Sequence, residues 1–209
     1  ARLRHDTTYD HMFLDGLEDA YEEGRAMGTC AQETANEYQL TREQMDDYSI
    51  ESLRRANAAI ESGAFSGEVV PVTFTTRAGE QTVDTDEAPG KGKPDKIPQL
   101  RPAFAKDGTI TAAPSSSISD GAAAVVLSRE SVAKENGQEP VAKIVAMAAH
   151  AQEPSEFTVA PVGAIEKVLK SAGWSADEVD LWEVNEAFAC VAMFAMRDIG
   201  IPHDKINVN

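Results

Sequence analysis

The chain has 209 residues, 42% of them hydrophobic, which is enough for one large or two small domains with an ordered core. It contains no apolar run that could span a membrane, and residues 1–30 are polar and amphipathic, so we expect neither membrane insertion nor a signal peptide. Nineteen basic against 35 acidic residues give a net charge of −16, which argues against nucleic-acid and anionic-membrane partners. Two cysteines are too few for a disulfide framework, so a cytoplasmic protein is expected. No His/Cys spacing indicates a metal site.

The first 63 residues show helical periodicity. Helices are predicted over residues 10–23, from Thr29 (a candidate N-cap) to Glu37, and from Thr41 to Ser62. The third is the best defined, because Thr41 and Gln44 have the spacing of a capping box and Gly63 follows the last periodic residue.

The period then changes to that of strands. Residues 69–76 alternate in polarity, turn at Ala78-Gly79 and return over 81–84, which predicts a hairpin. Pro71 cannot donate to a ladder, so its strand should be irregular or at an edge. Residues 85–99 are rich in Pro, Gly and Lys and are predicted to be a loop.

Beyond residue 120, strands and helices alternate. Strands are predicted over 122–127, 142–149, 180–184 and 206–209, and helices from Ser131, over 161–170 (ended by Gly173) and from Glu186; Ser175 is a candidate cap. This order indicates a helical-plus-hairpin subdomain followed by part of an α/β core. Because the chain starts abruptly and stops inside a predicted strand, we expect it to be a piece of a longer polypeptide.

Asn185 lies at the junction between a predicted buried strand and a helix. In an open α/β sheet, ligands bind at the carboxyl ends of strands, beside the free N–H groups of helix N-termini. The side chain of Asn185 can therefore cap the helix or direct its amide at a bound oxygen. A lone Asn would favour the capping role.

The pentapeptide Asn185-Glu186-Ala187-Phe188-Ala189 resembles the Asn-Glu-Ala-Phe-Ala signature of thiolases, enzymes that make or cleave 3-ketoacyl-CoA. Residues 100–104 resemble the family's Leu-Arg-Pro-x-Phe segment, and residues 111–121 its Thr-Ala-x-Asn-Ser-Ser-x-Ile-x-Asp-Gly loop. The resemblance covers nearly the whole chain. It implies an α/β architecture, part of the layered αβαβα thiolase fold with a helical-plus-hairpin loop domain.

The resemblance also implies a division of the chain. Residues 1–119 would form most of the loop domain, 120–153 the end of the N-terminal core domain, and 154–209 the start of the C-terminal core domain.

Within the signature, the resemblance makes Asn185 the catalytic residue. In thiolases this Asn holds a water that, with a His, stabilises the thioester oxyanion. Preorganised donors of this kind contribute about 2.7–4 kcal/mol each. Ala187 and Phe188 would wall the acyl pocket.

Five basic residues stand close together in a chain that is otherwise acidic: Lys91, Lys93, Lys96, Arg101 and Lys106. One interpretation is a solvated loop that keeps the protein soluble. The other is a surface for the phosphates of coenzyme A, because exposed lysines act as point charges toward phosphate. The resemblance favours the second, with Lys91, Lys93 and Lys96 as candidates, although an Arg that is common near this loop in the family is missing.

By the same resemblance, Leu100 and Phe104 would flank the adenine and pantetheine, Ser116 would contact the pantetheine arm, and Ala112 would lie beneath it. Leu100 and Phe104 could also be ordinary core residues, and a Ser-rich tract alone would be a turn or linker. Pro114 stands where the family usually has Asn.

Met27 would line the acyl site, in a Met-Gly-Thr segment where some thiolases have a His in place of Ala26. Phe157 falls at a position that is often apolar in the pocket. Filling a gap in the core is the alternative role for Met27.

Thiolase chemistry also needs a nucleophilic Cys, a His that activates it, and a second Cys that moves the α-carbon proton. Cys30 and Cys190 match neither cysteine motif and are expected to be buried, inert thiols, and none of the four histidines matches the family's motif. The segment alone should therefore be inactive.

The implied parent reaction is condensation of two acyl-CoA molecules, expected to be acetyl-CoA, or the reverse thiolysis. It needs no cofactor beyond the coenzyme A thioester, which is the substrate. The resemblance implies a homo-oligomer, a dimer or tetramer. The alternative is a non-catalytic CoA-binding or assembly subunit that completes a site with another chain.

Overall fold

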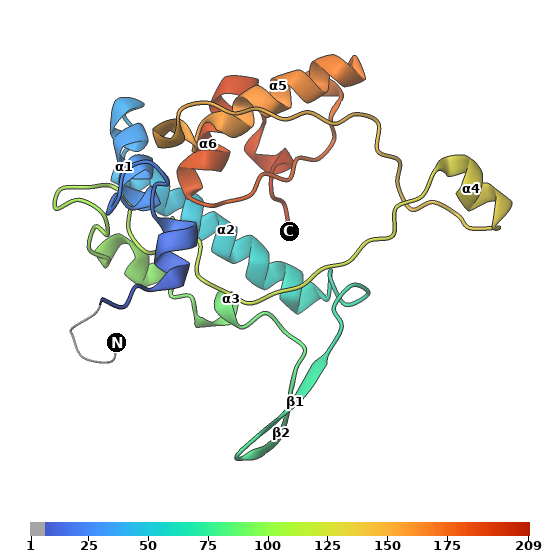
Figure 1. Ribbon diagram of the computed structural model, residues 1–209, viewed down its shortest axis with the longest axis horizontal. Coiled ribbons are helices and arrows are strands. Elements are labelled where there is room, and N and C mark those ends of the chain that lie inside the picture. Colours follow the sequence, from blue (N-terminus) through green and yellow to red (C-terminus); the bar gives the residue numbers. More distant parts are fainter. Residues whose placement is uncertain (1–6) are drawn as a thin grey trace.

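The computed structural model describes residues 7–209, so the first six residues of the predicted loop domain lie outside it. Its regular elements are α1 (Met27–Glu37), α2 (Arg42–Ser62), β1 (Val72–Thr76), β2 (Gly79–Val83), α3 (Glu87–Lys91), α4 (Glu130–Glu135), α5 (Ala160–Ala172) and α6 (Ala189–Ile199). Figure 1 shows α1, α2, α5 and α6 gathered in one body, from which the β1–β2 hairpin and α4 project.

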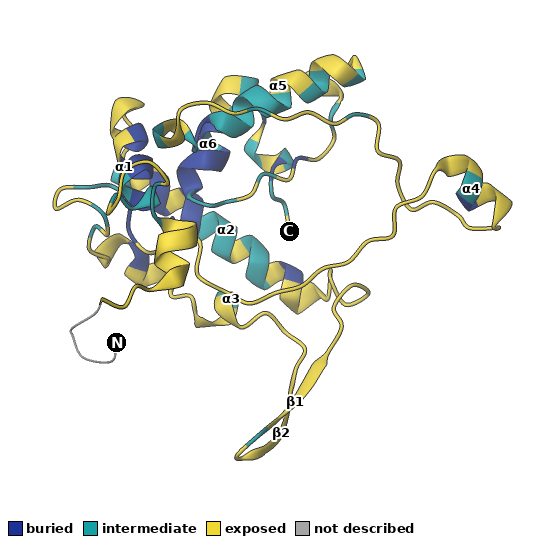
Figure 2. Cartoon of the chain, viewed as in Figure 1, coloured by how far each residue is buried: buried dark blue, intermediate teal, exposed yellow. Residues whose placement is uncertain are grey.

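Helix α6 is the centre of the packed body. Its residues are apolar nearly all the way round, which is the pattern of a helix surrounded by protein. Ala192, Phe194 and Ala195 are fully buried. One core cluster joins α6 to α1 and to Met45 of α2, and a second joins it to Tyr48 of α2 and to the apolar side chains near the C-terminus. The buried residues in Figure 2 accordingly concentrate on α1, α6 and part of α2.

The predicted limits of α2 and the predicted end of α5 are confirmed. Thr41 and Gln44 form a reciprocal capping box at the start of α2, and Gly63 ends it in the left-handed conformation, with φ of 70°. Gly173 ends α5 in the same way, and Ser175 caps a short 3₁₀ turn with Glu178.

The helix predicted over 10–23 is wrong beyond residue 17: only residues 11–17 are helical, the last five as a π-helical turn. The carboxylate of Asp19 accepts the N–H groups of Tyr21 and Glu22, at 2.8 and 3.0 Å, and so offers the backbone an alternative to the helix. The apolar face that suggested a helix is exposed to solvent.

Two of the predicted N-cap residues do not cap their helices. Helix α1 starts at Met27, so Thr29 is inside it and does not cap it. Helix α6 starts at Ala189 with Phe188 as its N-cap, so Asn185 does not cap it either. Phe188 is extended, and the residues before α6 pair with the Ser-rich loop through backbone hydrogen bonds.

The predicted hairpin is confirmed, with β1 antiparallel to β2 and Val72 opposite Val83. Its first strand begins only after Pro71. The prediction of a loop for 85–99 is wrong in part, because α3 lies within it, capped by Asp86, and is followed by a 3₁₀ turn over Pro94–Gln99.

The four strands predicted after residue 120 do not form a sheet among residues 7–209. Residues 122–127 and 142–149 are exposed, unpaired arms on either side of α4. The segments 180–184 and 206–209 share a single parallel bridge, between Trp182 and Ile206. A strand needs a neighbour to pair with, and no described segment lies beside the two arms.

Phe194 is the largest fully buried side chain, and its ring lies 5.0 Å from that of Tyr38. Replacing Phe194 with Ala should lower the free energy of unfolding by about 3–5 kcal/mol, since the packed body cannot refill the space. Urea denaturation followed by circular dichroism measures this. The matched control is Leu181→Ala, at a side chain 62% exposed, which should stay within about 0.5 kcal/mol. A loss below about 1 kcal/mol for Phe194→Ala would contradict the central position of α6.

Candidate functional site

The Ser-rich loop and the residues before α6 are joined by a short antiparallel strip. The N–H of Ala189 donates to the carbonyl of Pro114 at 2.8 Å, and the N–H of Ser116 donates to the carbonyl of Ala187 at 3.1 Å. The hydroxyl of Ser116 also donates to the backbone carbonyl of Glu186. Two motifs about 70 residues apart in the sequence therefore lie side by side.

Three aromatic rings gather next to this strip. The ring of Phe188 is 6.0 Å from that of Phe104, in an edge-on arrangement, and 6.2 Å from that of Phe157. Gly28 admits Phe104 against α1, because a Cβ at this position would lie 2.1 Å from the ring. Met27, the residue before Gly28, is half-buried at the start of α1. Phe104, Phe157 and Phe188 therefore form one apolar region.

The loop that carries Phe104 is held by Gln32, a buried residue of α1 that the sequence reading did not select. Its side-chain oxygen accepts the N–H groups of Thr109 and Ile110, both at 2.9 Å. Its amide nitrogen donates to the hydroxyl of Thr109 and to Asn36. Four polar contacts from one amide fix a segment that has no regular structure of its own.

The lysine-rich segment is attached to α2. Arg42 donates to the carbonyls of Ile97 and Leu100, both at 3.0 Å, and is itself held by Asp46 at 2.8 Å. Asn57 donates to the carbonyl of Pro89 at 3.4 Å. The backbone is therefore fixed at both ends of the lysine-bearing stretch.

The three candidate lysines point to solvent. Lys91 ends α3 and lies 3.5 Å from Glu87, with both side chains more than two-thirds exposed. Lys93 and Lys96 are exposed and form no ion pair with any residue of 7–209. Arg101 and Lys106 are exposed as well. The charges are available to an anion, because within residues 7–209 the one ion pair that these lysines form is that of Lys91 with Glu87.

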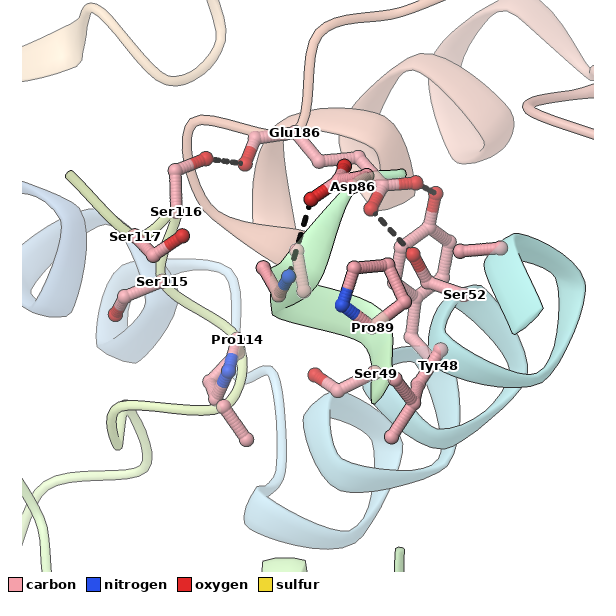
Figure 3. A pocket seen from close by; sticks show the side chains of 15 residues that line it. Tyr48, Ser49, Ser52, Asp86, Pro89, Pro114, Ser115, Ser116, Ser117 and Glu186 are labelled. Atoms are coloured by element: carbon pink, nitrogen blue, oxygen red, sulfur yellow. Dashed lines mark hydrogen bonds between the residues drawn. The ribbon is translucent and has the colours of Figure 1, made fainter. Parts of the chain in front are cut away.

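A cavity of about 440 Å³ lies between α2, α3 and the Ser-rich loop (Figure 3). Its walls include Tyr48, Ser52, Asp86, Ser116 and Glu186. Ser116 is the only predicted binding residue among its lining residues. The other predicted residues lie outside the cavity. The aromatic cluster does not line it, although Phe188 of the cluster belongs to the same antiparallel strip as Ser116.

The structure thus brings some predicted residues together and leaves others apart. Ser116, Ala187, Phe188, Phe104 and Phe157 are close neighbours around the strip. Leu100 and Ala112 are exposed on the loops that lead to it. Asn185 is exposed, and its side chain makes no hydrogen bond to the described part of the chain.

Glu186, the residue after Asn185, is another residue that the sequence analysis did not select. The Glu186 carboxylate accepts hydrogen bonds from Tyr48, Ser52 and Asn207, each at 2.7 Å. Two causes raise the pKa of Tyr48 far above its usual value: burial, which is the larger, and the hydrogen bond to Glu186. The phenol therefore remains protonated and donates. Glu186 stood inside the recognised signature, but nothing in the sequence places Tyr48 and Asn207 next to it.

Neither cysteine is placed to act as a nucleophile. Both thiols are buried, and burial raises the pKa of Cys190 to about 12 and also raises that of Cys30. Within residues 7–209 no three His, Cys, Asp or Glu side chains are grouped to hold a metal ion. The same part of the chain has no helix of the length and apolarity needed to cross a bilayer.

Comparison with known families supplies the identification. The family model "Thiolase, N-terminal domain" matches residues 1–131, and "Thiolase, C-terminal domain" matches residues 138–209. The chain belongs to the thiolase family.

Its relatives include a "Probable acetyl-CoA acetyltransferase" of Dictyostelium discoideum, 45% identical over 100% of this chain and 50% of the relative. The acetyl-CoA acetyltransferase of Yarrowia lipolytica is 46% identical over 95% of this chain and 50% of the relative. The chain thus spans about half the length of the curated relatives it matches.

Two solved structures share the fold. The crystal structure of the Bacillus anthracis acetyl-CoA acetyltransferase matches 99% of this chain and 52% of its own, with a TM-score of 0.92 and 36% identity. The Acat5 thiolase from Ascaris suum, solved in complex with coenzyme A, matches 95% of this chain and 51% of its own, with a TM-score of 0.88 and 41% identity. The thiolase fold is therefore shown.

The buried thiols give a direct test of the site. At about pH 8, Ellman's reagent should modify neither Cys30 nor Cys190 in the folded chain, because a buried thiol with a raised pKa forms almost no thiolate. Both should react once denaturant unfolds the protein. The matched control is Ser117→Cys, at an exposed loop position, which should react at once in the folded state. Rapid labelling of Cys190 without denaturant would contradict the packing of α6.

Proposed function

We propose that this chain is the coenzyme A-binding and oxyanion-stabilising part of an acetyl-CoA acetyltransferase. The complete reaction is a condensation of two acyl-CoA molecules, or the reverse thiolysis. The acyl group is carried on a cysteine supplied by polypeptide other than residues 1–209, since both cysteines of the chain are buried. The layered core, the division at residues 119 and 153, a homo-oligomeric assembly and a cytoplasmic location remain predictions.

The observation that carries this proposal is the placement of Asn185. Its side chain is exposed and unpaired among the described residues, while Glu186 and Ala187 on its C-terminal side are hydrogen-bonded to the Ser116 loop. A fixed backbone limits the positions that the Asn185 amide can reach, which reduces the reorganisation needed when charge develops on an acyl oxygen. The aromatic region around Phe188 is apolar, as suits the acyl chain and the end of pantetheine.

Electrostatics support coenzyme A as the ligand. A net charge of −16 repels a polyanionic nucleotide from most of the surface. The exposed Lys91, Lys93 and Lys96 offset this repulsion locally, and their segment is anchored on α2 by Arg42 and Asn57. The Ascaris suum relative, solved with coenzyme A, is consistent with this assignment.

Charge reversal at Lys91, Lys93 and Lys96, to Glu, should weaken coenzyme A binding by roughly tenfold to a hundredfold, because each exposed pair contributes about 0.2–1 kcal/mol and reversal adds repulsion. Isothermal titration calorimetry at low salt measures it, since salt screens exposed charges.

Two controls accompany this charge reversal. Reversing Lys134, Lys143 and Lys170, which are exposed elsewhere, gives the same net charge and should change binding by less than about threefold. Pantetheine, which lacks the nucleotide phosphates, should bind both variants like the parent chain. Unchanged coenzyme A binding after reversal at 91, 93 and 96 would favour the solvated-loop interpretation.

Asn185→Asp keeps the side chain's shape, removes its N–H donors and adds a negative charge beside the developing oxyanion. In a polypeptide of full thiolase length that contains this chain, kcat for thiolysis should fall by at least about a hundredfold to a thousandfold, the effect of losing one oxyanion donor. A steady-state assay across acyl-CoA chain lengths measures kcat and also identifies the substrate. Glu183→Gln, at an exposed neighbour on the same segment, should leave kcat unchanged. Full activity of the Asn185→Asp protein would contradict the assignment of Asn185 as the oxyanion-stabilising residue.

A further inference from the structure

The carboxylate of Glu186 connects two parts of the chain that are distant in sequence. Tyr48 and Ser52, one turn apart on α2, donate to its two oxygens, and Asn207 near the C-terminus donates to the oxygen that Tyr48 also uses. Figure 3 shows the side chains of Tyr48 and Ser52 directed at the carboxylate from α2. Both oxygens of the carboxylate are therefore hydrogen-bonded, by three donors in all.

Asn207 also fixes the residue on the other side of Asn185. Its side-chain oxygen accepts the N–H of Val184 and its amide nitrogen donates to the carbonyl of Val184, both at 2.8 Å. The side-chain amide thus makes the two hydrogen bonds to Val184 that the backbone of a neighbouring strand would make. The residue adopts a φ of 46°, which is uncommon outside glycine and is tolerated best by Asn and Asp.

Helix α2 holds the C-terminal segment through a second contact. Arg55 donates to the carbonyls of Ile206 at 2.7 Å and of His203 at 2.9 Å, and its charge is paired with Glu51 at 2.8 Å. Asn207 is therefore fixed by α2 as well, through the backbone of its neighbours. Glu186 and Asn207 form one polar connection between α2 and the Asn185 segment.

Asn185 is thus a free side chain on a fixed backbone. Val184 is held by Asn207, Glu186 by α2, and Ala187 by Ser116. All three contacts belong to residues that flank Asn185, and none involves its own side chain. The direction in which its amide projects depends on these neighbours.

We infer that Glu186 is a positioning residue, whose carboxylate, held by Tyr48, Ser52 and Asn207, sets the direction of the Asn185 amide. The catalytic part of this inference rests on the proposed function. The hydrogen bonds of Glu186 do not depend on it. A displacement of about 1 Å at a reacting group can cost roughly a hundredfold in rate. Loss of the carboxylate would also leave the hydroxyls of Tyr48 and Ser52 without this acceptor, while Asn207 would keep its bond to the carbonyl of Val184.

The contact can be tested on the 209-residue chain by amide hydrogen exchange. In Glu186→Ala, the amides of Val184 and Ser116 should exchange at least about tenfold faster, since their acceptors lie on segments tied to Glu186. Amides inside α6 should keep their parent rates, which separates local opening from global unfolding. The matched control, Glu183→Ala, removes an exposed carboxylate from the same segment and should change none of these rates. Unchanged exchange at both amides in Glu186→Ala would overturn the inference.

The positioning role is tested by kinetics in a polypeptide of full thiolase length. Glu186→Ala should lower kcat about tenfold to a hundredfold and leave KM within about twofold. Glu186→Gln should lose less, because one hydroxyl of Tyr48 or Ser52 can turn and accept from the new amide.

A double-mutant cycle separates positioning from general stability. If Glu186 acts through Asn185, then Glu186→Ala should lower kcat no further once Asn185 is already Ala. The same fold loss in both backgrounds, or a change in KM alone, would refute the positioning role. If Asn185→Ala itself leaves kcat unchanged, the proposed function fails, while the hydrogen-exchange result still decides whether the contact exists.

Discussion

The burial of helix α6 is the constraint on which the rest of this structure depends. Both core clusters are built on it, one toward α1 and one toward the C-terminal residues, and its side chains are apolar on nearly every side. Such a helix is stable only when other elements surround it, because its exposed state would leave too much apolar surface in water. The position of α6 then determines where its N-terminus lies, and the thiolase signature immediately precedes that N-terminus.

Around this core, single polar side chains hold segments that have no regular structure. Gln32 holds the loop of Phe104, Arg42 holds the lysine-rich segment, and Asn207 holds Val184. Each of them satisfies backbone groups that a sheet would otherwise satisfy. The chain has little sheet of its own, and it spans about half the length of its curated relatives. The binding segments are therefore ordered by contacts with α1 and α2 rather than by a ladder.

The sequence predicted local features well and distant pairings poorly. The capping box at Thr41 and the left-handed glycine at 63 act within a few residues, so their pattern can be read directly. The segments 122–127 and 142–149 have the composition of strands, yet a strand exists only with a neighbour, and none is present among residues 7–209. The cap of α6 was misplaced for a related reason, since the residues before the helix form backbone hydrogen bonds with the distant Ser-rich loop.

By itself, the sequence determined the family, through a signature around Asn185 and two upstream segments in the family's order. Such short motifs are specific because they are recognised from residue identity alone, without knowledge of the fold. The sequence also predicted that both thiols are buried, since neither matches a catalytic cysteine motif, and both are buried in the structure. Only the tertiary structure decided which groups surround Glu186. Tyr48 is 138 residues away in the chain, and a contact over that separation depends on the packing of α2 against α6 and not on any local pattern.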